Sequence, residues 1–452
     1  MGSSCDGGGG GGGEVSCCRS PKSPGLFLVT GIKSKQMLVS LLAIVCGLLL
    51  LLKNPSLLES ERWRPVIFQQ DHHLDLGSAL KNDRAVPIAA SHSSHSTNFG
   101  ISPSIDDDTT NTNGSGDRCD FSRGRWVFDE TKPRYTGHHC RAWLSKPWMC
   151  RLDRHHNLSY ESYRWQPRGC DLPGFDSTQL LHRLRNKTIA FVGDSLGRQQ
   201  YQSMICMLVG DASMPKITDV SIEYGLVTKG EGAQRFAATN TTVLFHWSAS
   251  LGDPQPLEAG LWALHLDRAP GFLARNAQRL DVVIVNTGHH WNRGKIRANK
   301  WVLHVDGKVA NLRVDAARRI ALTSAARWLG EQRERIRGFV RSLSPRHFRG
   351  GDWNSGGRCD GIREIEEEEE LGGDLIAQEA VRSTNGAVTL LEISNLSRTR
   401  GEAHISSAFV GSSSSSSSSS PRQQDCLHWC LPGVPDTWNE LLFAHLIDDR
   451  AP

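Results

Sequence analysis

The stretch TIAFVGDSL at residues 188–196 decides the predicted fold. Its apolar and β-branched residues indicate a short buried strand that stops at Gly193. After Ser195, apolar residues between positions 201 and 208 recur at the spacing of a helix with one face on the core. Ser195 is therefore expected at a strand–turn–helix corner, where the first N–H groups of the helix remain unpaired. That corner is a favourable position for a nucleophile.

Further strand and helix patterns follow this corner. Residues 241–247 and 281–286 read as strands, and the second is a continuous apolar run that ends in Asn-Thr-Gly. Residues 316–340 form a long amphipathic stretch that predicts a helix. Continuous apolar strands separated by helices predict an α/β fold with a parallel sheet. The active site of such a sheet lies at the carboxyl ends of its strands, where both Ser195 and Asn286 are expected.

Length and charge exclude some function classes. At 452 residues the chain is long enough for one large domain or two ordinary ones with a buried core. The formal net charge of +4 is small for this length, and no basic array with interleaved aromatic residues occurs. We therefore expect no nucleic-acid partner.

The amino-terminal part predicts a membrane anchor. Residues 37–52 are charge-free and mostly apolar, just under the usual length of a membrane span. A signal peptide or a buried helix is the alternative, but the preceding tail is long and no small-x-small cleavage site follows Leu52. Basic residues lie mostly before the span, so residues 1–36 are expected in the cytosol and the rest in a lumen. A short span suits the thinner membranes of the early secretory pathway.

Composition divides the predicted lumenal part. Residues 53–117 are rich in Ser, Asn, Asp and His and indicate a stem or linker. The aspartates at 106–108 could suggest a metal-binding glycosyltransferase, but a solvated linker charge run is the preferred interpretation. A folded lumenal domain is expected over residues 118–452. Low-complexity inserts near 364–373 and 411–421 indicate surface loops within it.

Eight cysteines follow the predicted span and suggest up to four disulfides in an oxidising lumen. The candidates are Cys119, Cys140, Cys150, Cys170, Cys206, Cys359, Cys426 and Cys430. Their many possible pairings leave the connectivity open. Cys426-x-His428-x-Cys430 could instead offer zinc ligands, but this is not a usual zinc spacing and no metal is expected. Sequons that fit lumenal glycosylation begin at Asn113, Asn157, Asn186, Asn240 and Asn395.

A serine nucleophile needs a base and an acid that orients the base. Asp425 and His428 stand three residues apart, so the carboxylate can accept from one ring nitrogen while the other faces Ser195. The alternatives are an ordinary helix N-cap for Ser195 and a surface histidine in a disulfide-bonded loop for His428. Asp194 is expected to support the turn and not to act as the acid of the triad.

Residues near the predicted nucleophile suggest how an oxyanion is stabilised. The backbone N–H of Ser195 and the side-chain amide of Asn286 are the expected donors, although Asn286 could simply cap a strand-end turn. Gly288 is expected to let the backbone approach the site closely. Arg198 could bind a carboxylate or phosphate near the helix start, with a solvated arginine as the alternative. His289 is given no role.

Gly-Asp-Ser after a strand, with Asp-x-x-His near the carboxyl terminus, resembles the GDSL/SGNH hydrolase pattern. Six blocks in chain order resemble more specifically the plant trichome-birefringence-like family of polysaccharide O-acetyltransferases. The blocks are CDFS with GRWV within 119–127, YRWQP at 163–167, FVGDSL at 191–196, VNTGH at 285–289, GGDWN at 350–354 and DCLHWCLPG at 425–433. They cover nearly all of the predicted lumenal part.

The resemblance implies an SGNH-like sheet flanked by helices and a single-pass Golgi anchor with a lumenal domain. It also implies acetyl transfer to a cell-wall polysaccharide, frequently xylan, through an acetyl-serine on Ser195. No bound cofactor is implied, but an acetyl donor such as acetyl-CoA or another carrier is required. The chain departs from the family at Gly197, where asparagine is common, and at His290, where tryptophan is usual. A glycan acetyl-esterase and a non-catalytic wall-polysaccharide-binding protein are the alternatives.

Overall fold

The computed structural model describes residues 119–152, 156–211, 215–360, 362, 372–409 and 424–448. All of them belong to the compact unit that runs from Asn98 to the carboxyl terminus. The predicted cytosolic tail, membrane span and stem lie outside the described residues, as do nearly all of the two inserts, and stay predictions. Across the described ranges, no helix is long and apolar enough to cross a membrane.

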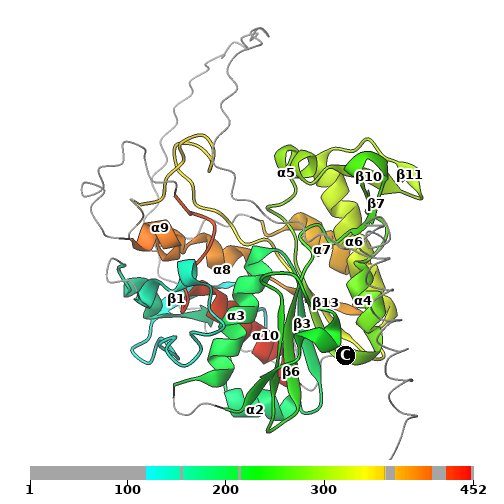
Figure 1. The fold of residues 1–452 in the computed structure, drawn as a ribbon. Helices are drawn as coiled ribbons and strands as arrows, with labels where there is room; N and C mark the ends of the chain where they lie inside the picture. Colours follow the sequence, from blue (N-terminus) through cyan, green and yellow to red (C-terminus); the bar gives the residue numbers. More distant parts are fainter. Residues whose placement is uncertain are drawn as a thin grey trace, which may run out of the picture. The chain divides into compact units, whose positions relative to one another are not determined.

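A seven-stranded sheet forms the centre of this unit, in the order β13-β12-β9-β3-β6-β5-β4 (Figure 1). The strands are β3 (Thr188–Gly193), β4 (Ile217–Asp219), β5 (Gly232–Phe236), β6 (Thr241–Trp247), β9 (Val282–Val285), β12 (Arg337–Arg341) and β13 (Val388–Leu391). Strands β13 to β6 are parallel, whereas β5 and β4 add an antiparallel edge. The predicted α/β class is confirmed, but the antiparallel edge was not expected.

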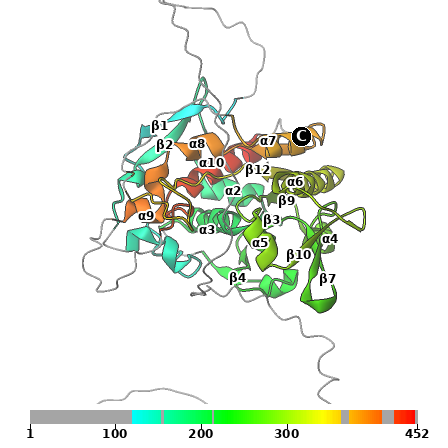
Figure 2. The ribbon, with the colours of Figure 1, turned by 90° about the horizontal axis from the view of Figure 1, so that it is seen from above.

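Helices cover both faces of the sheet (Figure 2). On one face lie α2 (Ser177–Arg183), α3 (Ser195–Val209) and α10 (Val434–Ile447), and on the other α4 (Gly271–Asn276), α6 (Val314–Glu331) and α7 (Leu375–Arg382). Successive residues of β3 alternate between the two cores, because side chains of a strand point to opposite faces in turn. Ile189 and Phe191 pack with the first group of helices, and Ala190 and Val192 with the second. Burial on both faces explains the unbroken apolar run of the strand.

Smaller elements complete the fold. A two-stranded sheet pairs β1 (Gly124–Phe128) with β2 (Tyr163–Pro167). A four-stranded sheet holds β7 (Asp253–Pro256), β8 (Trp262–His265), β10 (Trp301–Val305) and β11 (Lys308–Val309). Short helices are α5 (Arg293–Ala298), α8 (Ser394–Arg398) and α9 (Ile405–Ala408). Single 3₁₀ turns span Lys146–Trp148, Cys150–Leu152, Ser159–Glu161, Ser221–Tyr224, Glu258–Gly260, Ala277–Arg279 and Gly401–Ala403.

The predicted helix over residues 316–340 is wrong at its carboxyl end. Helix α6 stops at Glu331, and residues from Arg337 onward form strand β12. Phe339 pairs with Ile284 of β9 on one side and with Thr389 of β13 on the other. Pairing with two distant strands outweighs the helical spacing of the apolar residues, and this pairing cannot be read from local periodicity.

The strand order places the two predicted site motifs side by side. The parallel strands occur in the chain as β3, β6, β9, β12 and β13 but lie in the sheet as β6-β3-β9-β12-β13. The chain passes from β3 to β6 on one side and from β9 to β12 on the other, so the crevice at the carboxyl ends of β3 and β9 is the usual binding position in such a sheet. Val192 of β3 pairs with Val285 of β9, so Asp194 and Asn286 follow at neighbouring strand ends.

The eight candidate cysteines form four disulfides, which confirms their prediction. The pairs are Cys119–Cys170, Cys140–Cys206, Cys150–Cys430 and Cys359–Cys426. The last two tie residues 424–430, here called the triad loop, to two separate parts of the chain. Both sulfurs of the Cys426-x-His428-x-Cys430 motif are used in these bonds, so the zinc alternative loses two of its three ligands.

Candidate active site

Ser195 is the first residue of α3, directly at the end of β3. The N-cap of this helix is Asp194, whose carboxylate accepts from the backbone N–H of Leu196 at 3.0 Å. Asp194 therefore supports the turn, and the hydroxyl of Ser195 is not used as a cap. The described residues offer no hydrogen-bond acceptor to the N–H of Ser195, as is usual at a helix start.

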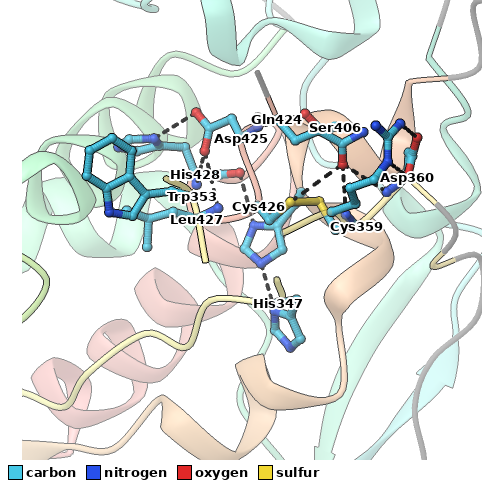
Figure 3. Close-up of a disulfide and its surroundings, with 12 residues drawn as sticks. His347, Trp353, Cys359, Asp360, Ser406, Gln424, Asp425, Cys426, Leu427 and His428 are labelled. Atoms are coloured by element: carbon cyan, nitrogen blue, oxygen red, sulfur yellow. Dashed lines mark hydrogen bonds and ion pairs between the residues drawn. A yellow bond between two sulfur atoms is a disulfide. The ribbon is translucent and has the colours of Figure 1, made fainter. Parts of the chain in front are cut away.

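A hydrogen-bonded chain links Ser195 to the triad loop. Nε2 of His428 lies 2.7 Å from Oγ of Ser195, and Nδ1 lies 2.9 Å from Oδ2 of Asp425. Oδ1 of Asp425 accepts from the backbone N–H groups of Leu427 and His428 at 3.2 and 2.9 Å. Figure 3 shows Asp425 beside Leu427 and His428, next to Cys426 and its disulfide with Cys359. The three residues predicted from the sequence are thus brought together.

The electrostatics of Asp425 suit it to orient the ring of His428. Burial alone raises the pKa of Asp425, but hydrogen bonds and charge from His428, with the N–H of Leu427, hold that pKa well below its ordinary value. The carboxylate stays ionised and accepts the Nδ1–H of His428. Nε2 then carries a lone pair that can take the proton of the Ser195 hydroxyl.

Helix α3 and a tryptophan fix the triad loop in place. Oε1 of Gln199 accepts a hydrogen bond from the backbone N–H of Trp429 at 3.1 Å, and Nε2 of Gln199 donates to the Trp429 carbonyl oxygen at 2.7 Å. The ring of Trp148 stacks on that of His428 with centroids 5.6 Å apart and an interplanar angle of 26°. Sequence reasoning missed both contacts. A glutamine four residues after Ser195, on the buried side of a helix, was the available signal for one of them.

Arg198 also contacts the ring of Trp148. Its guanidinium carbon is 4.8 Å from the centre of the tryptophan ring. Burial lowers the pKa of Arg198, yet the guanidinium stays charged. Among the described residues it has no hydrogen bond or ion pair, and its Nε is buried without an acceptor. The arrangement therefore leaves one cation near Ser195 available for an anionic group.

The side chain of Asn286 is hydrogen-bonded to Asp194. Its Nδ2 donates to Oδ1 of Asp194 at 2.7 Å, which leaves its second amide hydrogen for another acceptor. A Cβ on either Gly193 or Gly197 would collide with Oδ1 of Asn286. Gly197, one of the two departures from the family pattern, is therefore required by the position of this amide. The predicted role of Asn286 as an oxyanion donor stays a prediction.

The electrostatic environment of Asp194 involves an arginine that the sequence did not single out. Burial raises the pKa of Asp194, but attraction to His290 and Arg341, helped by the amide of Asn286, brings that pKa below its ordinary value. Arg341 is buried and donates to the carbonyl oxygen of Leu196 at 3.0 Å. It lies on a central strand without a local motif, so only the folded sheet brings it to the helix start.

Two neighbouring residues have structural contacts. A Cβ on Gly288 would collide with Cδ1 of Leu343, so this glycine leaves room for that side chain, and its predicted close approach to the site stays a prediction. His289 is 2.7 Å from the carbonyl oxygen of Ser344, and burial lowers its pKa to about 4. The ring is therefore neutral and donates Nε2–H to that oxygen.

Comparison with known proteins agrees with this architecture. Residues 172–445 match the GDSL/SGNH-like acyl-esterase family found in Pmr5 and Cas1p, and residues 117–171 match the PMR5 N-terminal domain. Protein trichome birefringence-like 14 of Arabidopsis thaliana is 44% identical over 355 residues, which cover 73% of this chain and 86% of that protein.

Two further relatives are similar over comparable lengths. Protein trichome birefringence-like 15 of Arabidopsis thaliana is 41% identical over 351 residues, covering 73% of this chain and 70% of that protein. Xylan O-acetyltransferase 14 of Oryza sativa subsp. japonica is 31% identical over 384 residues, covering 75% and 79%. With its α/β sheet, four disulfides and matching family regions, the chain belongs to the trichome birefringence-like family of GDSL/SGNH-like proteins.

Proposed function

We propose that the protein transfers acetyl groups to hydroxyls of a cell-wall polysaccharide, with xylan as the expected acceptor, through an acetyl-serine on Ser195. The observation that carries this proposal is the continuous hydrogen-bonded chain Asp425–His428–Ser195 at the head of α3. The similarity to a xylan O-acetyltransferase supports the choice of acceptor class.

In the first half-reaction, His428 takes the proton of the Ser195 hydroxyl while Oγ attacks the acetyl carbonyl carbon of the donor. Collapse of the tetrahedral intermediate breaks the bond to the leaving group, which receives the proton from His428. The carboxylate of Asp425 stabilises the imidazolium formed in between. The unpaired N–H of Ser195 and the second amide hydrogen of Asn286 are the proposed donors to the oxyanion.

In the second half-reaction, a sugar hydroxyl replaces the leaving group. His428 accepts its proton as the oxygen attacks the acetyl-serine, and then returns the proton to Oγ of Ser195. The ester passes to the polysaccharide and the hydroxyl of Ser195 is restored. Transfer requires that the acceptor displaces water from this position, because water in its place would give hydrolysis.

Arg198 is the proposed contact for an anionic part of a substrate. Its guanidinium packs over the ring of Trp148 but has no anionic partner among the described residues, and Arg198 lies one helical turn after Ser195. A phosphate of the acetyl donor and a uronate of the acceptor would both fit a guanidinium. The proposed location is the Golgi membrane, with the acyltransferase domain in the lumen and anchored by residues 37–52.

The test is acetyl transfer by the full-length protein from labelled acetyl donors to deacetylated xylan oligomers. Ser195→Ala is expected to abolish transfer, and an exposed serine variant outside any sequon, Ser383→Ala, is expected to leave it unchanged. Wild-type transfer by Ser195→Ala contradicts the mechanism. Release of acetate from acetylated xylan without transfer would instead identify a glycan acetyl-esterase, a reaction that the acyl-esterase name of the matching family also allows.

A further inference from the structure

Two buried histidines lie behind the triad loop. Nδ1 of His404 is 3.0 Å from the carbonyl oxygen of His428, and its Nε2 is 2.7 Å from Nδ1 of His347. Nε2 of His347 is 2.6 Å from the carbonyl oxygen of Arg398. His404 is fully buried, and Figure 3 shows the dashed contact of the His347 ring. Two carbonyl oxygens thus stand at the outer ends of a chain of two rings.

This chain needs one proton more than two neutral rings provide. Carbonyl oxygens only accept, so Nδ1 of His404 and Nε2 of His347 must each carry a hydrogen. The second nitrogen of a neutral imidazole is a lone pair, and two such lone pairs would repel each other at 2.7 Å. Flipping either ring would replace both of its contacts by C–H groups and lose them. One added proton between the rings turns the repulsive contact into a hydrogen bond.

The surroundings are compatible with one added charge but not with two. Burial and the charge of His347 hold the pKa of His404 well below its ordinary value, so a separate proton on each ring is disfavoured. The carbonyl of His428 and the carboxylate of Asp425 act in the opposite direction, and a charged His428 repels the pair. The His404 ring also stacks on Trp429 with centroids 3.8 Å apart, which gives an imidazolium a cation–π interaction.

We propose that His404 and His347 share a single proton and that this charged pair positions His428 for its reaction with Ser195. The inference rests on the proposed role of His428 as the base. The charged pair acts on His428 through the hydrogen bond that Nδ1 of His404 donates to the backbone carbonyl of His428. His404 is fully buried and acts through the backbone of His428, and His347 acts through His404, so both are positioning residues.

Loss of the shared proton loosens this support. As the pH rises through the single ionisation of the pair, the two lone pairs face each other and the contact between the rings opens. His404 then no longer keeps its place under His428, whose ring must hold Nε2 within hydrogen-bonding distance of Ser195. Misplacement of a catalytic group by about 1 Å costs on the order of 100-fold in rate. The kcat is therefore expected to fall with this ionisation.

A proton count tests the inference without relying on activity. Full-length Ser195→Ala protein with nitrogen-15 histidine is titrated by NMR, and the two rings are assigned by the signals lost in His347→Gln and His404→Phe. We expect three protonated ring nitrogens over the two residues at mildly acidic pH, falling to two in one step. Two protonated nitrogens throughout the folded range, or independent titration of the two rings, overturns the inference.

The pH profile of acetyl transfer is the second readout. His347→Gln keeps an amide donor for the carbonyl of Arg398 and leaves His404 neutral, so the fall in kcat that follows the NMR step is expected to disappear. His404→Phe removes the donor to His428 and is expected to lower kcat about tenfold or more at every pH with KM unchanged. The exposed His182→Gln is the control and is expected to keep the wild-type profile.

These outcomes separate the inference from the proposed function. A wild-type pH profile in His347→Gln overturns the positioning role even if Ser195→Ala is inactive. A proton count of three with fully active Ser195→Ala overturns the triad mechanism, and with it the link between the shared proton and catalysis. If His404→Phe does not fold, His347→Gln and the proton count still decide the inference.

Discussion

Asp425→Asn is the substitution that most sharply tests the orientation of His428. Oδ1 of the asparagine can keep the two bonds from the backbone N–H groups of Leu427 and His428, so the loop is expected to fold as before. Its Nδ2 replaces the oxygen that faces Nδ1 of His428, and an amide nitrogen cannot accept a hydrogen. The ring is then driven to the tautomer with hydrogen on Nε2, which cannot take the proton of Ser195.

The expected loss follows from this single change of tautomer. In a serine–histidine–aspartate triad the same substitution costs about 10⁴ in kcat, which corresponds to about 5.5 kcal/mol of transition-state stabilisation. The assay is initial-rate acetyl transfer to xylan oligomers, with circular dichroism to check the fold. Asp315→Asn is the matched control, because Asp315 is exposed in the first turn of α6 and the substitution creates no glycosylation sequon. A loss below about tenfold would refute the orienting role of Asp425.

Three further substitutions test the surroundings of the site. Gly197→Ala forces a Cβ against Asn286 and is expected to lower both the rate of transfer and the free energy of unfolding. The loss in free energy of unfolding is expected to be about 1–3 kcal/mol. Gly174→Ala is the control and is expected to change neither, because its Cβ would meet no close atom. Burial raises the pKa of Asp436 to about 6. The free energy of unfolding, measured in urea, is therefore expected to fall as the pH rises from about 4 towards that value. An equally steep fall in the Asp436→Asn variant would contradict this. Arg198→Gln is expected to raise KM for the anionic substrate more than it lowers kcat, and equal KM values for charged and neutral acceptors would argue against the anion contact.

The sequence predicts the elements of this site well because they are encoded locally. The apolar run before Gly193 must be a strand buried on both faces, and Ile189 and Ala190 do pack in different cores. The spacing of Asp425 and His428 likewise limits how far apart their side chains can lie. A short turn suffices to bring them to 2.9 Å.

The remaining features depend on which distant segments meet. The pairing of Cys150 with Cys430 spans 280 residues, and no local pattern selects it from the other pairings. Arg341 and His404 have no motif of their own, and their contacts exist only after the sheet and the triad loop are in place. The apolar residues around Phe339 fit a helix in spacing, yet they form a central strand because β9 and β13 pair with it.

The most direct measurement is to detect acetyl on Ser195 itself. Full-length protein is incubated with an isotope-labelled acetyl donor in the absence of acceptor, quenched in acid and digested, and the peptide containing residues 188–198 is analysed by mass spectrometry. We expect the label on Ser195 and its quantitative discharge to xylan oligomers when they are added before quenching. Transfer to the oligomers with no label ever found on Ser195, or a label on Ser195 that the acceptor does not discharge, would contradict the acetyl-serine mechanism.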